Sequence, residues 1–352
     1  MPFFIAHRGC PHRCVFCDQE QIAGGDGSLP SASEIRGKVA VWRRSSGGLP
    51  VEAAFFGGSF TALPTEDQEK LLLPLQPLLE KGQVASIRVS TRPDALDAQC
   101  ASFLRRMGVT KVELGVQSLD EEVLEQSGRG HDAGPVGEAI ECLKGEGISV
   151  GLQLMPGLPG DTAEKSLNTL SAALGLAPDF LRIYPTVVLA GTRLAELFDA
   201  GIYRPLTLQQ AVTLCKVMLH RALISGVPVV RMGLQPTEDL NRQGTVVAGP
   251  YHPAFRQLVE AELRYDLLAR LVDDGCRGAS GVVVYCAPSR ISDVKGQRGG
   301  NLDRLLRERG VRVTSVRGDS RFSRFECSVA GPDCTRTGSI LSDLNYSHKD
   351  LL

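Results

Sequence analysis

Three cysteines near the start of the chain have the residue type and spacing to hold an inorganic cofactor. Cys10, Cys14 and Cys17 follow a short apolar segment in the pattern C-x3-C-x2-C. Three thiolates on one tight loop suit a cubane iron–sulfur cluster whose fourth iron is left open for a substrate or a second cofactor. A structural zinc site is the alternative. It would need His7 or His12 as a fourth ligand, because such sites are normally closed by four protein ligands.

A glycine-containing turn after the second apolar segment is a candidate for contact with a bound ligand. The turn contains Gly57, Gly58 and Ser59. Glycine has no Cβ, so backbone groups can approach a ligand closely there, and the serine adds a hydroxyl oxygen. An ordinary strand-to-helix turn would also use glycines at this place.

Further polar residues stand where later apolar segments end. Gln117 ends one such segment, Arg129 follows it by twelve residues, and Gln153 lies in the next. A guanidinium matches a carboxylate in a way that a lysine does not. Parallel α/β folds bind ligands at the carboxyl ends of their strands, which is where these residues are expected.

Together these motifs resemble the radical S-adenosylmethionine (SAM) superfamily over residues 1 to about 230. The resemblance implies that Cys10, Cys14 and Cys17 hold a [4Fe-4S] cluster, which binds SAM and cleaves it reductively to a 5'-deoxyadenosyl radical. It also implies SAM contacts for the residues singled out above and an adenine contact for the aromatic between the last two cysteines. These SAM-binding candidates are Phe16, Gly57, Gly58, Ser59, Gln117, Arg129 and Gln153.

Other segments resemble more specifically the radical SAM half of the Elongator catalytic subunit, which modifies tRNA. They are Ala6 to Gly9, Ser90 to Asp94, Arg182 to Leu194 and Gly201 to Thr207. That subunit carries an acetyltransferase half behind its radical domain. We expect this chain to lack a full acetyltransferase domain.

The chain alternates short apolar runs with amphipathic stretches, which predicts strands that alternate with helices. Helix start signals with capping-box spacing occur at Ser31, Thr65, Asp161 and Thr207. Such alternation requires parallel strands joined by right-handed crossovers. With the resemblance, it predicts an α/β fold: a partial (β/α)6 TIM-type barrel. Its six strands are expected at Phe3 to Ala6, Val51 to Phe56, Ser86 to Ser90, Lys111 to Val116, Ser149 to Leu154 and Phe180 to Tyr184.

The alternation stops near residue 230, and a different pattern follows. We predict a barrel domain over residues 1–232, a connecting segment with a long helix over 233–278, a small α+β unit over 279–326 and a weakly patterned tail over 327–352. The small unit has the order β-α-α-β. We expect this unit to form a second, KH-like domain at the C-terminal side.

A loop between the two short helices of this small unit resembles the GXXG loop of KH domains, which clamps a nucleic-acid backbone. The candidate RNA-binding residues are Lys295, Gly296, Gln297, Arg298 and Gly299. Residues 288–326 hold ten Lys or Arg and five Asp or Glu, a local net charge of +5. That charge favours RNA, because phosphate contacts dominate such binding. A glycine-rich turn on a solvated basic face is the alternative.

Composition and net charge exclude some classes of protein. The net charge of −1 excludes a uniformly basic nucleic-acid coat, and no apolar run is long enough to span a bilayer. We therefore expect a cytoplasmic protein with no membrane partner, in which the ten cysteines stay reduced and form no disulfide framework. Four late cysteines could hold an auxiliary cluster, although their spacing matches no compact motif: Cys276, Cys286, Cys327 and Cys334.

Three function classes stay open. The first is a radical SAM enzyme that modifies RNA, with tRNA as the possible substrate. The second is a radical SAM enzyme that acts on a small molecule or peptide, similar to coproporphyrinogen oxidation, with a purely structural tail. The third is an RNA-binding protein that keeps the cluster as a structural or sensing element, which the intact SAM positions disfavour. Either enzyme would need a reductant protein such as ferredoxin or flavodoxin.

Overall fold

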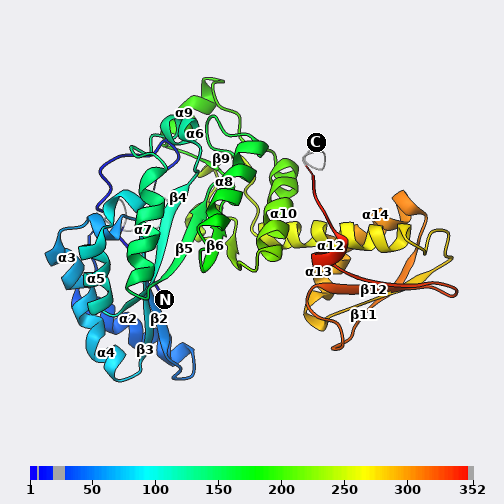
Figure 1. Ribbon diagram of the computed structural model, residues 1–352, viewed down its shortest axis with the longest axis horizontal. Helices are drawn as coiled ribbons and strands as arrows, with labels where there is room; N and C mark the ends of the chain where they lie inside the picture. The colour runs from blue at the N-terminus through cyan, green and yellow to red at the C-terminus, as the bar shows by residue number, and fades with distance from the viewer. Residues whose placement is uncertain (6–7, 19–27, 348–352) are drawn as a thin grey trace. The chain divides into compact units, whose positions relative to one another are not determined.

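The fold is described from a computed structural model of the chain, which covers residues 1–5, 8–18 and 28–347. Contacts divide the chain into two compact units. The first unit comprises residues 1–206 and 227–250, and the second comprises residues 207–226 and 251–352. Residues 207–226 are thus grouped with the second unit, whereas the sequence places a boundary after residue 232, and that boundary stays a prediction. Figure 1 colours the chain from its N-terminus to its C-terminus.

The core of the first unit is a parallel sheet with strand order β1-β2-β3-β4-β5-β6-β8. β1 and β8 are its edges, so the sheet curls without closing, which confirms the predicted partial barrel. β8 is not among the six predicted strands: it has four residues, and Arg231 interrupts its apolar run. The strands are β1 (Pro2–Phe4), β2 (Val51–Phe56), β3 (Val84–Thr91), β4 (Val109–Gln117), β5 (Ser149–Leu154), β6 (Phe180–Ile183) and β8 (Val229–Met232).

Helices alternate with these strands, as Figure 1 shows. α2 packs on β2, α5 on β4, and α7 on β4 and β5. The helices are α2 (Ala32–Ser45), α3 (Thr65–Leu72), α4 (Gln76–Glu80), α5 (Ala98–Arg106), α6 (Glu121–Gln126), α7 (Gly134–Gly145), α8 (Ala163–Gly175), α9 (Arg193–Asp199) and α11 (Glu238–Asn241). A short antiparallel pair, β7 (Val188–Leu189) and β9 (Val246–Ala248), completes the unit.

Two of the four predicted helix starts have the expected capping box. Ser31 caps α2, and Thr207 caps α10 (Leu208–Ile224). The other two differ by one residue. α3 follows Pro64, which offers no side-chain acceptor, and α8 is capped by Thr162, because Asp161 is used inside the preceding loop.

The two faces of the parallel sheet differ in chemistry. In β3, Ile87 and Val89 are fully buried, whereas Arg88 and Ser90, which alternate with them, stay partly exposed. Parallel sheets are usually buried and apolar on both faces. Here helices pack against one face, and the other, which we call the inner face, carries partly exposed polar residues. The inner face is therefore available for ligands.

The second unit packs two long helices and a four-stranded sheet of order β11-β10-β12-β13, in which β10 and β11 are parallel. Its predicted β-α-α-β order is present as β10, α13, α14 and β11. The tail that appeared weakly patterned supplies β12 and β13, whose polar residues conceal the strand pattern. The elements are α10, α12 (Phe255–Asp273), β10 (Val282–Cys286), α13 (Ile291–Lys295), α14 (Gly300–Arg309), β11 (Val313–Gly318), β12 (Glu326–Ala330), β13 (Thr335–Ser339) and α15 (Ile340–Asp343). Among the described helices, none is both long and apolar enough to cross a membrane.

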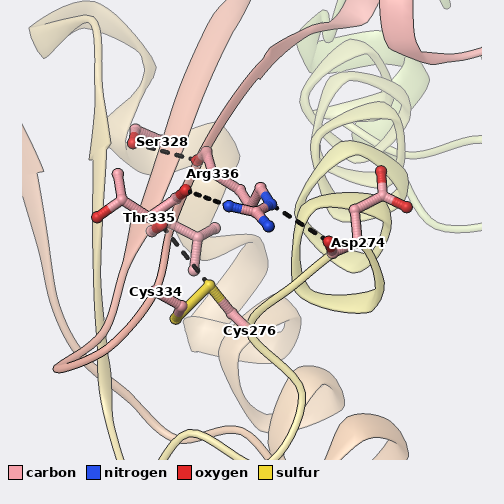
Figure 2. The surroundings of a disulfide bond; sticks show 7 residues. Asp274, Cys276, Ser328, Cys334, Thr335 and Arg336 are labelled. Carbon is pink, nitrogen blue, oxygen red and sulfur yellow. Dashed lines mark hydrogen bonds between the residues drawn. A yellow bond between two sulfur atoms is a disulfide. The ribbon is translucent and has the colours of Figure 1, made fainter.

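One disulfide joins Cys276 and Cys334 in the second unit, which corrects the expectation that all ten cysteines are reduced (Figure 2). The two residues are 58 positions apart in the chain, and the fold of β13 beside the end of α12 brings them together. Next to the disulfide, Arg336 donates a hydrogen bond of 3.2 Å to the backbone oxygen of Asp274. Cys286 and Cys327 are buried free thiols opposite each other on β10 and β12. The late cysteines thus form two pairs, and the disulfide leaves Cys276 and Cys334 without free thiols for an auxiliary cluster.

Candidate functional site

The cysteine loop follows β1 and contacts loops that leave the neighbouring strands. The Cys10 Sγ lies 3.3 Å from the Ser59 Oγ, and the Cys14 Sγ accepts a hydrogen bond of 3.4 Å from Arg129. Within the loop, the Cys17 amide donates to the Cys14 carbonyl oxygen at 3.1 Å. The structure thus brings Ser59 and Arg129, from distant parts of the sequence, to the cysteines.

The environment of the three thiols suits a cationic inorganic centre. Burial, together with the neighbouring Cys14 and Cys10, raises the pKa of Cys17 to about 12, and Arg129 opposes this rise. Thiolates crowded into a partly buried loop repel one another. Metal ions remove that repulsion, because only the deprotonated sulfur binds them and their charge compensates it. The donor set therefore fits an iron–sulfur cluster.

A single zinc ion would need its ligands closer together than a cubane cluster does. Within residues 1–5, 8–18 and 28–347, no three Cys, His, Asp or Glu side chains form a group that could hold a metal ion. Tetrahedral zinc would need sulfurs roughly 3.8 Å apart at a bond length of about 2.3 Å. The ligands of a cubane sit on different irons and are spaced more widely. His7 lies outside the described residues, and a Cβ added at Gly130 would come within 2.3 Å of the His12 ring, which therefore packs against Gly130.

Arg129 is buried between the cysteine loop and the end of β4. One Nη donates to the Gly115 oxygen at 2.5 Å and the other to the Cys14 Sγ, while its buried Nε has no partner in the described structure. The backbone oxygen of Arg129 accepts a hydrogen bond of 2.7 Å from Arg92, which also forms a bidentate pair with Asp94. Arg129 can therefore present a donor to a carboxylate. Sequence reasoning noted Arg92 and Asp94 only as a resemblance, and their role in holding Arg129 appears in the structure.

Gln117 and Gln153 meet on the inner face. The Gln153 Nε2 donates to the Gln117 Oε1 at 3.1 Å. Gln117 has a φ of 67°, which is unusual for a residue with a side chain and is typical of strain at functional sites. The predicted pair of amide side chains is thus adjacent and lies at the ends of neighbouring strands.

The glycine turn after β2 packs against the backbone of the cysteine loop. A Cβ added at Gly58 would lie 2.3 Å from the Arg8 carbonyl oxygen and 2.6 Å from that of Ile5. A Cβ at Gly9 would lie 2.3 Å from the backbone carbonyl oxygen of Ser59. Glycine at these two positions allows the turn after β2 and the cysteine loop to pack closely against each other. Close approach of protein backbone already accounts for Gly58, whatever ligand the turn contacts.

Phe16, for which the resemblance implies an adenine contact, is partly buried against a group of apolar side chains. Its ring packs against a hydrophobic cluster formed by Val188, Leu194, Ala195 and Tyr203. The backbone supports this packing, since the Leu194 amide donates to the Val15 oxygen at 2.7 Å. The segment after β6 therefore anchors the cysteine loop.

The loop after β5 is fixed by side chains around Gly157. The Asp161 carboxylate accepts from the Gly157 amide at 2.7 Å and from the Ser166 hydroxyl at 2.6 Å. The Tyr203 hydroxyl donates to the Gly157 oxygen at 2.5 Å. Burial raises the pKa of Asp161 and of Tyr203. Tyr203 thus connects this loop with the cluster that holds Phe16.

The glycine loop of the second unit lies between α13 and α14. Lys295, Gln297 and Arg298 are exposed, and Arg298 has a φ of 54°. The buried Asn301 donates to the Ala261, Asp293 and Val294 oxygens and holds the loop in place. Four of the ten basic residues in this region form ion pairs, namely Arg290, Arg304, Arg309 and Arg321. Lys295 and Arg298 form no ion pair with any described residue.

Comparison with known proteins identifies the class. The Radical SAM superfamily profile matches residues 4–173, and the Radical_SAM C-terminal domain profile matches residues 178–265. The chain belongs to the radical SAM superfamily, whose members use a [4Fe-4S] cluster and SAM.

Several relatives share the radical SAM region. A tRNA uridine(34) acetyltransferase of Methanocaldococcus infernus is 31% identical over 58% of this chain and 46% of its own length. The human Elongator complex protein 3 is 31% identical over 44% of this chain and 32% of its own. The archaeal Methanocaldococcus infernus Elp3 structure superposes with a TM-score of 0.58 at 22% identity, covering 76% of this chain and 63% of that one, which supports the shared fold. The chain spans about half the length, or less, of these two curated relatives.

Proposed function

We propose that this protein is an enzyme that reductively cleaves SAM at a [4Fe-4S] cluster held by Cys10, Cys14 and Cys17. When bound, the cluster supplies the electron for that cleavage. The observation that carries the proposal is Arg129, which contacts Cys14 with one Nη and whose buried Nε has no hydrogen-bond partner among the described residues. This places a cation beside the cysteine loop, where the carboxylate of SAM would bind.

The chain's own residues would orient SAM around this point. Arg129 would pair with the SAM carboxylate through a charge-assisted hydrogen bond. Gln117 and Gln153, already hydrogen-bonded to each other, would face its ribose hydroxyls. Backbone oxygens of the turn with Gly57 and Gly58 would accept from its amino group. The Ser59 hydroxyl is engaged with Cys10 and would hold that thiolate in position.

We further propose that the substrate is RNA, with tRNA favoured. Support comes from the similarity to a tRNA uridine(34) acetyltransferase and from the exposed cations of the loop Lys295 to Gly299. A reductant protein such as ferredoxin or flavodoxin would serve the enzyme in the cytoplasm. The test is anaerobic incubation of the reconstituted protein with SAM, reductant and bulk tRNA, followed by mass spectrometry of the nucleosides. A new nucleoside supports the proposal, and its absence favours a small-molecule or peptide substrate.

Replacing Arg129 with alanine should weaken SAM binding by about 2 to 3 kcal/mol, because a charge-assisted pair is lost from a buried site. The measurement is equilibrium dialysis of SAM against the reconstituted protein. The exposed Arg106→Ala protein serves as control and should bind SAM like the wild type. Iron content should be the same in both variants. Unchanged SAM affinity in the Arg129→Ala protein would show that this arginine does not bind the carboxylate.

Replacing Gln297 and Arg298 with aspartate should lower tRNA affinity at least tenfold, roughly 1.4 kcal/mol, because two carboxylates would meet the phosphates. Filter binding at low salt measures the effect. A matched control carries Arg277→Asp and Ser280→Asp, which make the same change of charge at another exposed loop of the second unit. Equal tRNA affinity of both double variants would remove the loop Lys295 to Gly299 from the RNA site.

A further inference from the structure

A row of polar residues crosses the inner face of the sheet beside the candidate SAM site. Strand register pairs Gln153 on β5 with Arg182 on β6, and Arg182 with Arg231 on β8. The register shifts between Leu181 and Arg182, and this irregularity brings Arg231 beside Arg182. Arg231 thus lies two strands from a residue that we assign to SAM. A substrate next to SAM would meet these two guanidinium groups.

The ion pairs on this face leave Arg231 without a carboxylate. Glu113 pairs with Arg88 at 2.7 Å and with Arg182. Glu52 is shared between Arg88 and Lys111, at 2.5 Å each. Arg231 forms no ion pair with any described residue, and its Nε donates to the Gly233 oxygen at 3.3 Å.

Arg182 and Arg231 occupy paired positions on neighbouring strands, and of the two only Arg182 has a carboxylate partner among the described residues, so the arrangement is electrostatically incomplete. Like charges directly opposite each other on paired strands are destabilising. An oxyanion bound between Arg182 and Arg231 would remove that repulsion. Guanidinium is suited to this role, because its planar donors match phosphate or carboxylate oxygens in pairs.

Aromatic rings hold one of these guanidiniums in place. The Arg182 Cζ lies 5.2 Å from the centre of the Phe56 ring and 5.1 Å from that of Tyr184. With Glu113 as a third contact, Arg182 has little freedom left to lose on binding. Burial raises the pKa of Tyr184, so its neutral hydroxyl stays available as a donor on the same face. The Arg182 side of the site is therefore organised before a ligand arrives.

We infer that Arg182 and Arg231 form an oxyanion site for the substrate, and that a phosphate group of a nucleotide occupies it. The choice of phosphate rests on the proposed function, since the proposed RNA substrate carries phosphates. The site lies on the inner face and is separate from Arg129, to which the SAM carboxylate is assigned. A carboxylate of a small molecule would use the same donors, so the experiment includes both groups.

The test measures binding of uridine 5'-phosphate, uridine and propionate to the anaerobically reconstituted full chain with SAM present. The Arg231→Gln protein is compared with the wild type, with Arg231→Lys, and with Arg36→Gln, an exposed arginine on α2. The wild type and Arg36→Gln should bind uridine 5'-phosphate at least tenfold more tightly than uridine. Arg231→Gln should lose that preference, and Arg231→Lys should keep only part of it. Trp42 fluorescence and iron content verify folding.

The outcomes separate this inference from the proposed function. If the wild type shows no preference for the phosphorylated ligand, or if Arg231→Gln retains it, the oxyanion site is wrong even where tRNA becomes modified. If propionate alone depends on Arg231, the assignment to phosphate is wrong. If Arg231→Gln loses the phosphate preference while the wild type yields no new nucleoside, the site stands and the RNA substrate does not.

Discussion

Replacing Cys14 with alanine is expected to leave a protein that contains no [4Fe-4S] centre and cleaves no SAM. Cys10, Cys14 and Cys17 would each be the only protein ligand of one iron, so losing any of them opens the cluster to solvent. The wild type, prepared anaerobically, should contain about four irons per chain, and each single alanine variant should contain almost none. Iron analysis and detection of 5'-deoxyadenosine measure the two effects.

Cys100 provides the matched control for these variants. It is partly buried in α5, and burial raises the pKa of its thiol to about 11, so it stays a neutral thiol at neutral pH. Cys100→Ala should therefore keep full iron content and activity. A Cys14→Ala protein with the iron content and SAM cleavage of the wild type would contradict the assignment of the cluster to this loop.

Replacing Glu113 with glutamine should destabilise the first unit by about 3 kcal/mol. The carboxylate is 3% exposed and binds two guanidiniums, those of Arg88 and Arg182. Removing one partner of a buried ion pair costs roughly 3 to 5 kcal/mol, because it leaves uncompensated charge. The lower value applies here, since both arginine side chains are 20% exposed and water screens them in part.

Trp42, the single tryptophan of the chain, lies in α2 and reports on the first unit alone. Urea unfolding followed by its fluorescence should show the loss in the Glu113→Gln protein. Glu69→Gln removes a carboxylate from the exposed face of α3 and should change the free energy of unfolding by less than about 0.5 kcal/mol. Equal midpoints for the two variants would show that the Glu113 network contributes little to stability.

Much of the fold and the central chemistry could be predicted from the sequence because they depend on local patterns. The cysteine spacing lies within eight residues of one loop, and the periodicity of each strand and helix is a property of consecutive residues. Alternation of strands and helices then leaves only parallel pairing, which places Gln117 and Gln153 at neighbouring strand ends. These predictions needed no knowledge of distant contacts. β8 was missed because its four residues carry too little pattern.

Contacts between distant residues were decided only by the tertiary structure. Arg92 reaches the Arg129 oxygen across 37 positions, and Cys276 meets Cys334 across 58. Phe16 packs against the segment after β6, where sequence spacing gives no sign of the contact. The register irregularity beside Arg182 places Arg231 opposite Arg182 on the neighbouring strand β8. A register shift of one residue would have placed Arg231 on the other face of the sheet. Register and side-chain packing depend on the whole sheet, so the charge arrangement of the inner face cannot be derived from any local stretch of sequence.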